Sequence, residues 1–161
     1  MSTVTINRDP EPVFLFWRNP ANLTLLHGPV TDVTPIDGRE RWTIAGPGGV
    51  RGVLDMRLVE EVPLELLLWE AEGVGEGPWF SVELRAGPTR GTEVFVAARI
   101  PPPVPVRTAR RLTGLLAQAE LETMLRRARA LLETGEFPTT EGQSSGRERV
   151  APSGTPSVAE R

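Results

Sequence analysis

The stretch STVTINRDPEPVFLFWRNPANLTLL, residues 2–26, sets the architecture expected for the chain. Residues 2–7 alternate between polar and apolar side chains, which is typical of a strand with one buried face. Asp9 suits the N-cap of a helix and Pro10 suits its first position, so a helix is expected to begin there. Pro20 ends this helix and begins a second, shorter one. The predicted start of the fold is therefore a strand followed by two short helices.

An antiparallel meander is predicted from residue 29 to residue 100. Turn signals such as Asp37-Gly38 and the GPGG run at 46–49 recur between segments of period-2 alternation. Each segment has one apolar and one charged face, which is typical of a sheet covered on one side only. The apolar faces of the strands expected at 39–46, 51–61, 78–86 and 91–100 consist of Trp42 and Ile44; Leu54, Met56 and Leu58; Phe80, Val82 and Leu84; and Thr92, Val94, Val96 and Ala98.

A long helix is predicted at 104–134 as the cover of this apolar face. The segment has no strand alternation, and its Leu, Met and Ala residues recur at helical spacing with Arg residues on the other side. Gly114 is expected to break or kink the helix, and Gly135 to cap its C-terminus. Beyond the helix the chain becomes rich in Pro, Gly, Ser and Thr. The expected organisation is a domain at 1–136 followed by a polar tail at 137–161 that cannot fold alone.

The composition of the 161 residues excludes several classes of chemistry. All 18 basic residues are Arg, which excludes Schiff-base chemistry at Lys and phosphate loops of the GKS or GKT type. The absence of Cys and Tyr excludes thiol and phenol chemistry. His27 is the only histidine, so the chain alone cannot supply a multi-histidine zinc site. We therefore expect neither a metal nor a cofactor.

Charge and hydropathy bear on partners and location. The net charge of −3 gives no reason to expect nucleic acid or an anionic membrane as a partner. The longest apolar run, Leu66 to Trp69, is far shorter than the ~20 residues that cross a bilayer, and residues 1–10 show no secretory signal pattern. The expectation is a cytoplasmic protein without a transmembrane segment, for which the sequence leaves a homodimer open.

Four segments carry a family resemblance, namely INRDPEPVFLFWRNPANL at 6–23, LDMRLVEEVPLELLLWE at 54–70, RGTEV at 90–94 and LLETGEFPTTEGQSSG at 131–146. In this order they resemble the START-like, or SRPBCC, superfamily of polyketide cyclases/dehydrases and lipid-transfer proteins, and within it an uncharacterised bacterial subgroup. The resemblance implies an α+β helix-grip fold, in which an antiparallel sheet of about six to seven strands curves around a long C-terminal helix. The matching segments are structural and contain no catalytic signature.

The resemblance also implies where a ligand would lie. Superfamily members that bind ligands hold them between the sheet and the long helix, so we expect a hydrophobic or amphipathic small molecule there, such as a lipid, quinone or polyketide-like compound. A polyketide cyclase/dehydratase-type enzyme and a cavity-free protein-interaction domain are the alternatives, and a solidly packed core gives the same periodicity. The candidate ligand-binding residues are Trp42, Ile44, Leu54, Met56, Leu58, Trp69, Trp79, Phe80, Val82, Val94, Val96, Leu121, Met124 and Leu125.

Some side chains allow both a structural and a functional interpretation. Trp69 either packs beneath the short helices, which we favour, or stacks on a ligand at the rim, and Trp79 follows a Gly-rich loop where it could close one end of the site. His27 would suit proton transfer if it faced the cavity, but a lone loop histidine is most often solvated or structurally hydrogen-bonded. Asp55 and Arg57 are expected in cross-strand ion pairs on the charged outer face, unless the inward phase of their strand is reversed.

Overall fold

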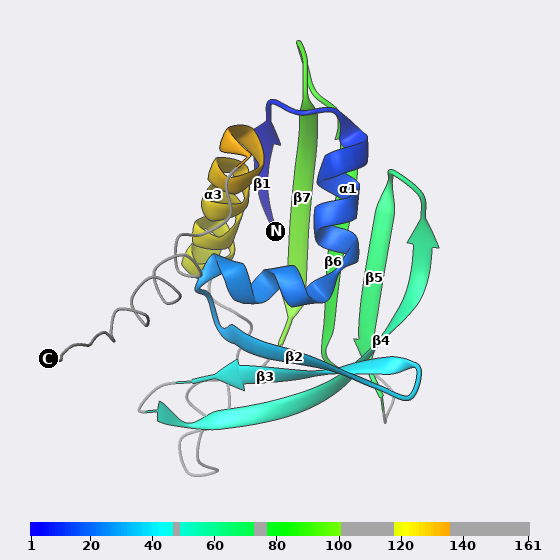
Figure 1. Ribbon diagram of the computed structural model, residues 1–161, viewed down its shortest axis with the longest axis vertical. Helices are drawn as coiled ribbons and strands as arrows, with labels where there is room; N and C mark the ends of the chain where they lie inside the picture. Colours follow the sequence, from blue (N-terminus) through cyan, green and yellow to red (C-terminus); the bar gives the residue numbers. More distant parts are fainter. Residues whose placement is uncertain (47–48, 73–76, 101–117, 136–161) are drawn as a thin grey trace, which may run out of the picture.

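One curved sheet organises the molecule. In the computed structural model, which describes residues 1–46, 49–72, 77–100 and 118–135, seven antiparallel strands form a sheet in the order β1-β7-β6-β5-β4-β3-β2 (Figure 1). The strands are β1 (Ser2–Ile6), β2 (Val30–Ile36), β3 (Arg39–Ala45), β4 (Arg51–Val62), β5 (Leu66–Ala71), β6 (Trp79–Ala86) and β7 (Thr92–Arg99). The helices are α1 (Pro10–Arg18), the 3-10 helix η1 (Pro20–Leu26) and α3 (Gln118–Thr134). This α+β arrangement is the helix-grip fold that the sequence predicted.

The long strand β4 bends the sheet around its inner face. Its first half pairs with β3 and its second half with β5, and Met56 lies opposite both Glu40 of β3 and Ala71 of β5. The register shifts between Leu58 and Glu60, and a bulge of this kind bends a strand and increases its twist. As a result, β2 and β3 run nearly across the direction of β5, β6 and β7 (Figure 1).

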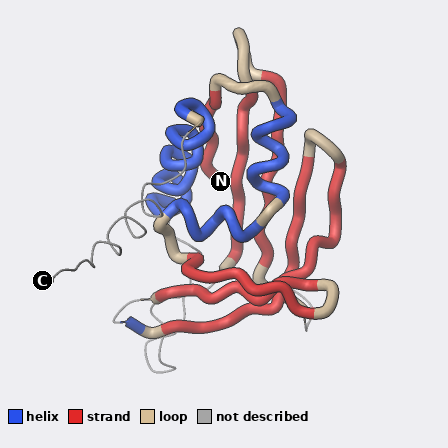
Figure 2. The backbone as a smooth tube through the Cα atoms, in the orientation of Figure 1, coloured by secondary structure: helices blue, strands red, loops and turns tan. Residues whose placement is uncertain are grey.

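The helices cover the inner face of the sheet (Figure 2). α3 lies beside β1 and reaches β7, whereas α1 contacts β6 and η1 contacts β2. The helices bury their apolar residues in the same core as the strands, and these residues are Val13, Phe14, Phe16, Trp17, Leu23, Leu26, Leu121, Met124, Leu125 and Ala128. The core formed by the described residues therefore lies between the sheet and its covering helices, where the periodicity of the sequence predicted it.

The predicted cover helix is seen as α3. Residues 104–117, with the predicted break at Gly114, and the predicted tail at 137–161 lie outside the described residues. Gly135 follows α3 in the left-handed conformation, at φ 76°, and its N–H donates to the Leu131 carbonyl at 2.9 Å. The predicted C-cap is therefore confirmed.

The starts of the two short helices follow the sequence with one correction. Asp9 precedes α1 in an extended conformation and Pro10 opens the helix, but the Asp9 carboxylate makes no capping hydrogen bond. At the next helix a side chain does cap, because Oδ1 of Asn19 accepts from the Ala21 N–H at 3.2 Å. The predicted second helix begins at Pro20 and is a 3-10 helix.

Candidate functional site

The candidate ligand-binding residues converge on the inner face of the sheet. Leu54 and Leu58 are partly buried against the core, and Trp79 is half-buried at the start of β6. The other eleven are fully buried, and they are Trp42, Ile44, Met56, Trp69, Phe80, Val82, Val94, Val96, Leu121, Met124 and Leu125. The inward phase predicted for β3, β4, β6, β7 and the helix is confirmed, and on β5, whose phase the sequence left open, Leu67 and Trp69 face inward. The ligand-binding role of the candidate residues stays a prediction.

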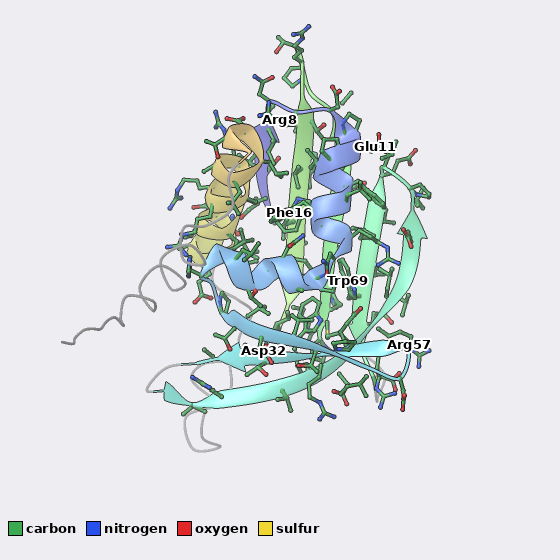
Figure 3. The ribbon with its side chains drawn as sticks, viewed as in Figure 1. Arg8, Glu11, Phe16, Asp32, Arg57 and Trp69 are labelled. Carbon is green, nitrogen blue, oxygen red and sulfur yellow. The ribbon has the colours of Figure 1, made fainter. Side chains whose placement is uncertain are left out.

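Three side chains form what we call the aromatic centre of this face, namely Trp42 of β3, Trp69 of β5 and Phe80 of β6. The ring centroids of Trp42 and Trp69 are 6.0 Å apart, and that of Phe80 lies 5.7 Å from Trp42 and 5.9 Å from Trp69. All three are at most 1% exposed, and tilted or edge-to-face contacts of this kind stabilise a core. Trp69, labelled in Figure 3, therefore belongs to the packed centre rather than to a rim.

Three buried indole nitrogens of this core and one buried oxygen of the partly buried Glu40 have no hydrogen-bond partner among the described residues. They are Nε1 of Trp17, Trp42 and Trp69 and Oε1 of Glu40, while a fifth such atom, Nε of Arg39, belongs to the outer face. A buried polar atom without a partner costs about 1–3 kcal/mol. Most buried polar atoms in folded proteins have a partner in the protein or in ordered water.

Glu40 is a functional candidate that the sequence analysis missed. It lies two residues before Trp42 on β3, so strand alternation places both side chains on the inner face. Burial raises the pKa of Glu40, and the positive charge of Arg18 partly opposes this rise. Arg18, the last residue of α1, lies with its Nε 3.0 Å from a carboxylate oxygen of Glu61 on β4. The inner face thus carries one carboxyl group of altered acidity beside an apolar surface.

The other polar candidates lie outside this face. His27 is exposed in the loop after η1, where its backbone is left-handed. On the outer face, Nε of Arg41 donates to Oδ1 of Asp55 at 2.8 Å, and this bond holds the pKa of Asp55 below its ordinary value. Arg57 forms an ion pair with Glu72 on the same side. The predicted cross-strand pairs are confirmed, and the reversed strand phase is excluded.

Two surface clefts formed by described residues lie away from the aromatic centre. One, of about 630 Å³, lies between the N-terminus of α1, the β4–β5 turn and the adjoining ends of β6 and β7. The other, of about 370 Å³, lies between β1 and α3. None of the candidate ligand-binding residues lines the first cleft, and Leu125 alone lines the second. Neither cleft is therefore the predicted ligand site.

The ranges that the structure describes contain no group of three or more His, Cys, Asp or Glu side chains placed to hold a metal ion. No helix within those ranges is both long enough and apolar enough to cross a bilayer.

Comparison with known proteins bears on the fold. No protein-family model matches the sequence, and no curated protein matches it. Among solved structures, a crystal structure of a Deinococcus radiodurans protein is similar with a TM-score of 0.63 and 26% identity, over 83% of this chain and 95% of that chain.

Two further similar structures come from biosynthetic systems. StfQ, a di-domain ARO/CYC from the steffimycin biosynthetic pathway, has a TM-score of 0.55 and 11% identity, over 83% of this chain and 50% of its own. DynU16, a protein of the dynemicin biosynthetic locus, has a TM-score of 0.52 and 20% identity, over 84% of this chain and 47% of its own. This chain thus spans about half the length of each. Together these likenesses show that the chain shares the fold of these proteins.

Proposed function

We propose that the protein binds a hydrophobic or amphipathic small molecule against the inner face of its sheet. The observation that carries the proposal is the combination of a broad apolar face with buried polar atoms that lack partners among the described residues. A core that only fills space gains nothing from unpaired indole and carboxyl groups, whereas ligand sites are mostly apolar with a few polar groups that set orientation. The likeness to DynU16 and StfQ supports a site of this type.

Desolvation of the ligand provides the driving force for binding. Each Å² of apolar surface removed from water contributes about 25 cal/mol. Met56 faces the site from the sheet and Met124 from α3, and their unbranched thioether chains can adapt to a ligand.

Access of a ligand to this site requires a covering helix to move. If η1 moves away from α3, it must break the hydrogen bonds that Nη1 of Arg127 donates to the carbonyls of Leu26 at 2.6 Å and His27 at 2.8 Å.

Mass spectrometry of a native preparation tests the proposal. The full chain is purified without denaturant and extracted with organic solvent, and any small molecule that co-purifies is identified. We expect a hydrophobic compound in stoichiometric amount. Met56→Glu should abolish its retention, because the new carboxylate would lie among buried apolar side chains.

Val53→Glu is the matched control, since Val53 lies on the same strand but is 58% exposed. Circular dichroism must show that both variants fold, and Met56→Leu, which keeps the volume and polarity of the site, should retain the compound. Equal retention by Met56→Glu and Val53→Glu would contradict the proposal. An empty extract, combined with no binding of the apolar dye N-phenyl-1-naphthylamine, would also contradict it.

Catalysis of the polyketide cyclase/dehydratase type is the second candidate function. The observation that favours it is Glu40, because a carboxyl group whose pKa is raised by burial is a candidate general acid or base. The test is conversion of a model poly-β-ketone, followed by mass spectrometry. Turnover that is present in the unmodified protein and lost in Glu40→Gln would support catalysis. Product formation at the same rate in both proteins would exclude Glu40 from it.

A further inference from the structure

Strand β6 extends past the start of β5, as the long β6–β7 hairpin shows (Figure 1). The pairing of β5 with β6 ends at Leu66 opposite Glu83, whereas β6 continues to pair with β7 as far as Ala86 opposite Thr92. The last three residues of β6, at 84–86, therefore have β7 on one side and no strand of the described residues on the other. We call this stretch the open edge of β6.

The direction of two hydrogen bonds shows which backbone groups face the open edge. The N–H of Gly87 donates to the carbonyl of Gly91 on the β7 side at 3.0 Å, and the N–H of Leu84 donates to the carbonyl of Glu65 on the opposite side at 2.8 Å. Successive residues of an antiparallel strand turn their backbone groups to alternate sides. Ala86, two positions after Leu84, therefore presents both its N–H and its carbonyl to the open edge.

The β4–β5 turn keeps this edge open. The N–H of Glu65, which could otherwise reach the carbonyl of Leu84, donates to the carbonyl of Val62 at 2.9 Å and closes the turn. Leu64 occupies the position of the turn where glycine is favoured, with φ 67°. Its side chain is 41% exposed and lines the adjoining cleft. A strained leucine beside unpaired backbone groups marks this place as a candidate site.

The cleft of about 630 Å³ described above lies along the open edge and provides room for a ligand. Besides the backbone groups, it is lined by apolar side chains and by three charged ones, namely Pro10, Val62, Leu64, Leu66, Leu84, Ala86, Glu65, Glu83 and Arg85. The Glu83 carboxylate pairs with Arg85 at 3.4 Å, and no such partner is found for Glu65 among the described residues. The lining thus has one carboxylate in excess, which favours a cationic group on the ligand.

We propose that an extended peptide segment with a basic side chain binds in this cleft as an added strand on β6. The N–H of Ala86 donates to a peptide carbonyl, and the carbonyls of Ala86 and Leu84 accept from peptide N–H groups, which is the pattern of strand addition at a sheet edge. Apolar peptide side chains pack against Leu64, and the basic side chain faces Glu65. This site is separate from the inner face, so it stands or falls independently of the proposed function.

The test titrates the ¹⁵N-labelled full chain with the peptide acetyl-Arg-Val-Arg-Val-amide and follows the backbone amide resonances by NMR. We expect saturable binding that shifts the amide resonance of Ala86. Two isomeric peptides are then compared, one methylated at both Val backbone nitrogens and one at both Arg backbone nitrogens. Only alternate N–H groups of an added strand face the sheet, so one isomer should bind roughly 10-fold more weakly and the other should keep its affinity.

Two pairs of variants locate the site. Ala86→Pro removes the N–H that faces the open edge, where proline is tolerated, and should weaken binding roughly 3- to 10-fold, whereas Ala86→Val keeps the N–H and should not. Glu65→Gln should reduce roughly 2- to 5-fold the preference for this peptide over acetyl-Glu-Val-Glu-Val-amide. Glu70→Gln, at an exposed position near the other end of β5, should leave that preference unchanged.

The outcomes decide as follows. Absence of binding, or equal affinity of the two methylated isomers, overturns the inference. Binding that is the same in Ala86→Pro and Ala86→Val also overturns it, because the peptide would then lie elsewhere. If circular dichroism shows that Ala86→Pro does not fold, the methylated isomers decide, since they are measured on the unmodified protein.

Discussion

Arg8 closes the C-terminal end of α3, although Arg8 and Leu132 are 124 positions apart in the sequence. Nε of Arg8 donates to the Leu132 carbonyl at 2.8 Å, and its Nη2 donates to the Glu133 carbonyl. The last carbonyls of a helix have no partner within the helix and carry a partial negative charge, so a guanidinium group satisfies both needs. The loop between β1 and α1 is thereby tied to the helix that covers the core.

Arg8→Ala should lower the free energy of unfolding by about 0.5–1.5 kcal/mol, because it removes this cap from an exposed helix end. Urea denaturation monitored by circular dichroism measures the change. Arg90→Ala is the control, since Arg90 is also exposed but lies in the β6–β7 turn, far from α3 in the chain. Equal losses in the two variants would show that the contact of Arg8 with α3 contributes nothing.

Gly91 and Gly38 should differ sharply in their tolerance of alanine. Both have a positive φ, 84° and 78° respectively, so alanine strains either backbone by about 1–2 kcal/mol. A Cβ at Gly91 would also lie 2.4 Å from the carbonyl oxygen of Ile6, whereas a Cβ at Gly38 would meet nothing within 4 Å. Thermal unfolding should therefore show a clearly larger loss for Gly91→Ala. Matching losses would mean that β1 can move away without penalty.

Glu40→Gln should make the protein more stable at neutral pH. Because the pKa of Glu40 is raised in the folded state, protonation of its carboxyl group stabilises the fold. This stabilisation is fully present below the ordinary pKa of 4.5 and is lost as pH rises through the raised pKa of the folded state. Glutamine cannot ionise, so the advantage of the variant should shrink at about pH 4. Urea denaturation at both pH values, with exposed Glu60→Gln as the control, makes the comparison. A variant less stable than the unmodified protein at neutral pH would refute this expectation.

Asp55→Asn should show the opposite pH dependence. The hydrogen bond from Arg41 lowers the pKa of Asp55, so its contribution to stability is present above the ordinary value of 3.8 and is lost as pH falls through the lowered value. The variant should thus be slightly less stable at neutral pH, with a difference that vanishes in acid and weakens in salt because the pair is open to solvent. Urea denaturation across pH and NaCl measures this. A loss insensitive to both would point to packing instead.

Strand phase was predictable wherever one face of a strand is apolar and the other charged. Val94 and Val96 of β7 are both buried as predicted, and Phe95 between them lies on the other face, where the guanidinium carbon of Arg85 is 4.4 Å from its ring centroid. The LELLLWE segment was ambiguous because each of its two faces combines large apolar side chains with one glutamate. Leu67 and Trp69 of that segment are the buried pair, and the bulge after Leu58 on the neighbouring strand sets how β5 lies against β4.

Glu40 shows why part of the candidate site escaped prediction. The residues around it, DGRER at 37–41, suggest a solvated turn and the start of a charged strand. The phase of Trp42 and Ile44 does place Glu40 on the inner face. Alternation cannot show how far along the strand that face is covered, however, and burial of the carboxyl group depends on the surrounding tertiary structure.

Local spacing was sufficient to establish the order of the elements and, except at β5, the face that each presents, because alternation and helical periodicity are properties of neighbouring residues. The aromatic centre and its unpartnered polar atoms depend on register and on helix docking between segments far apart in the chain. Trp42 and Phe80 meet at 5.7 Å only because β4 and β5 lie between their strands and the sheet is curved. No local pattern encodes that distance, so the polar groups that a ligand would meet were decided by the tertiary structure.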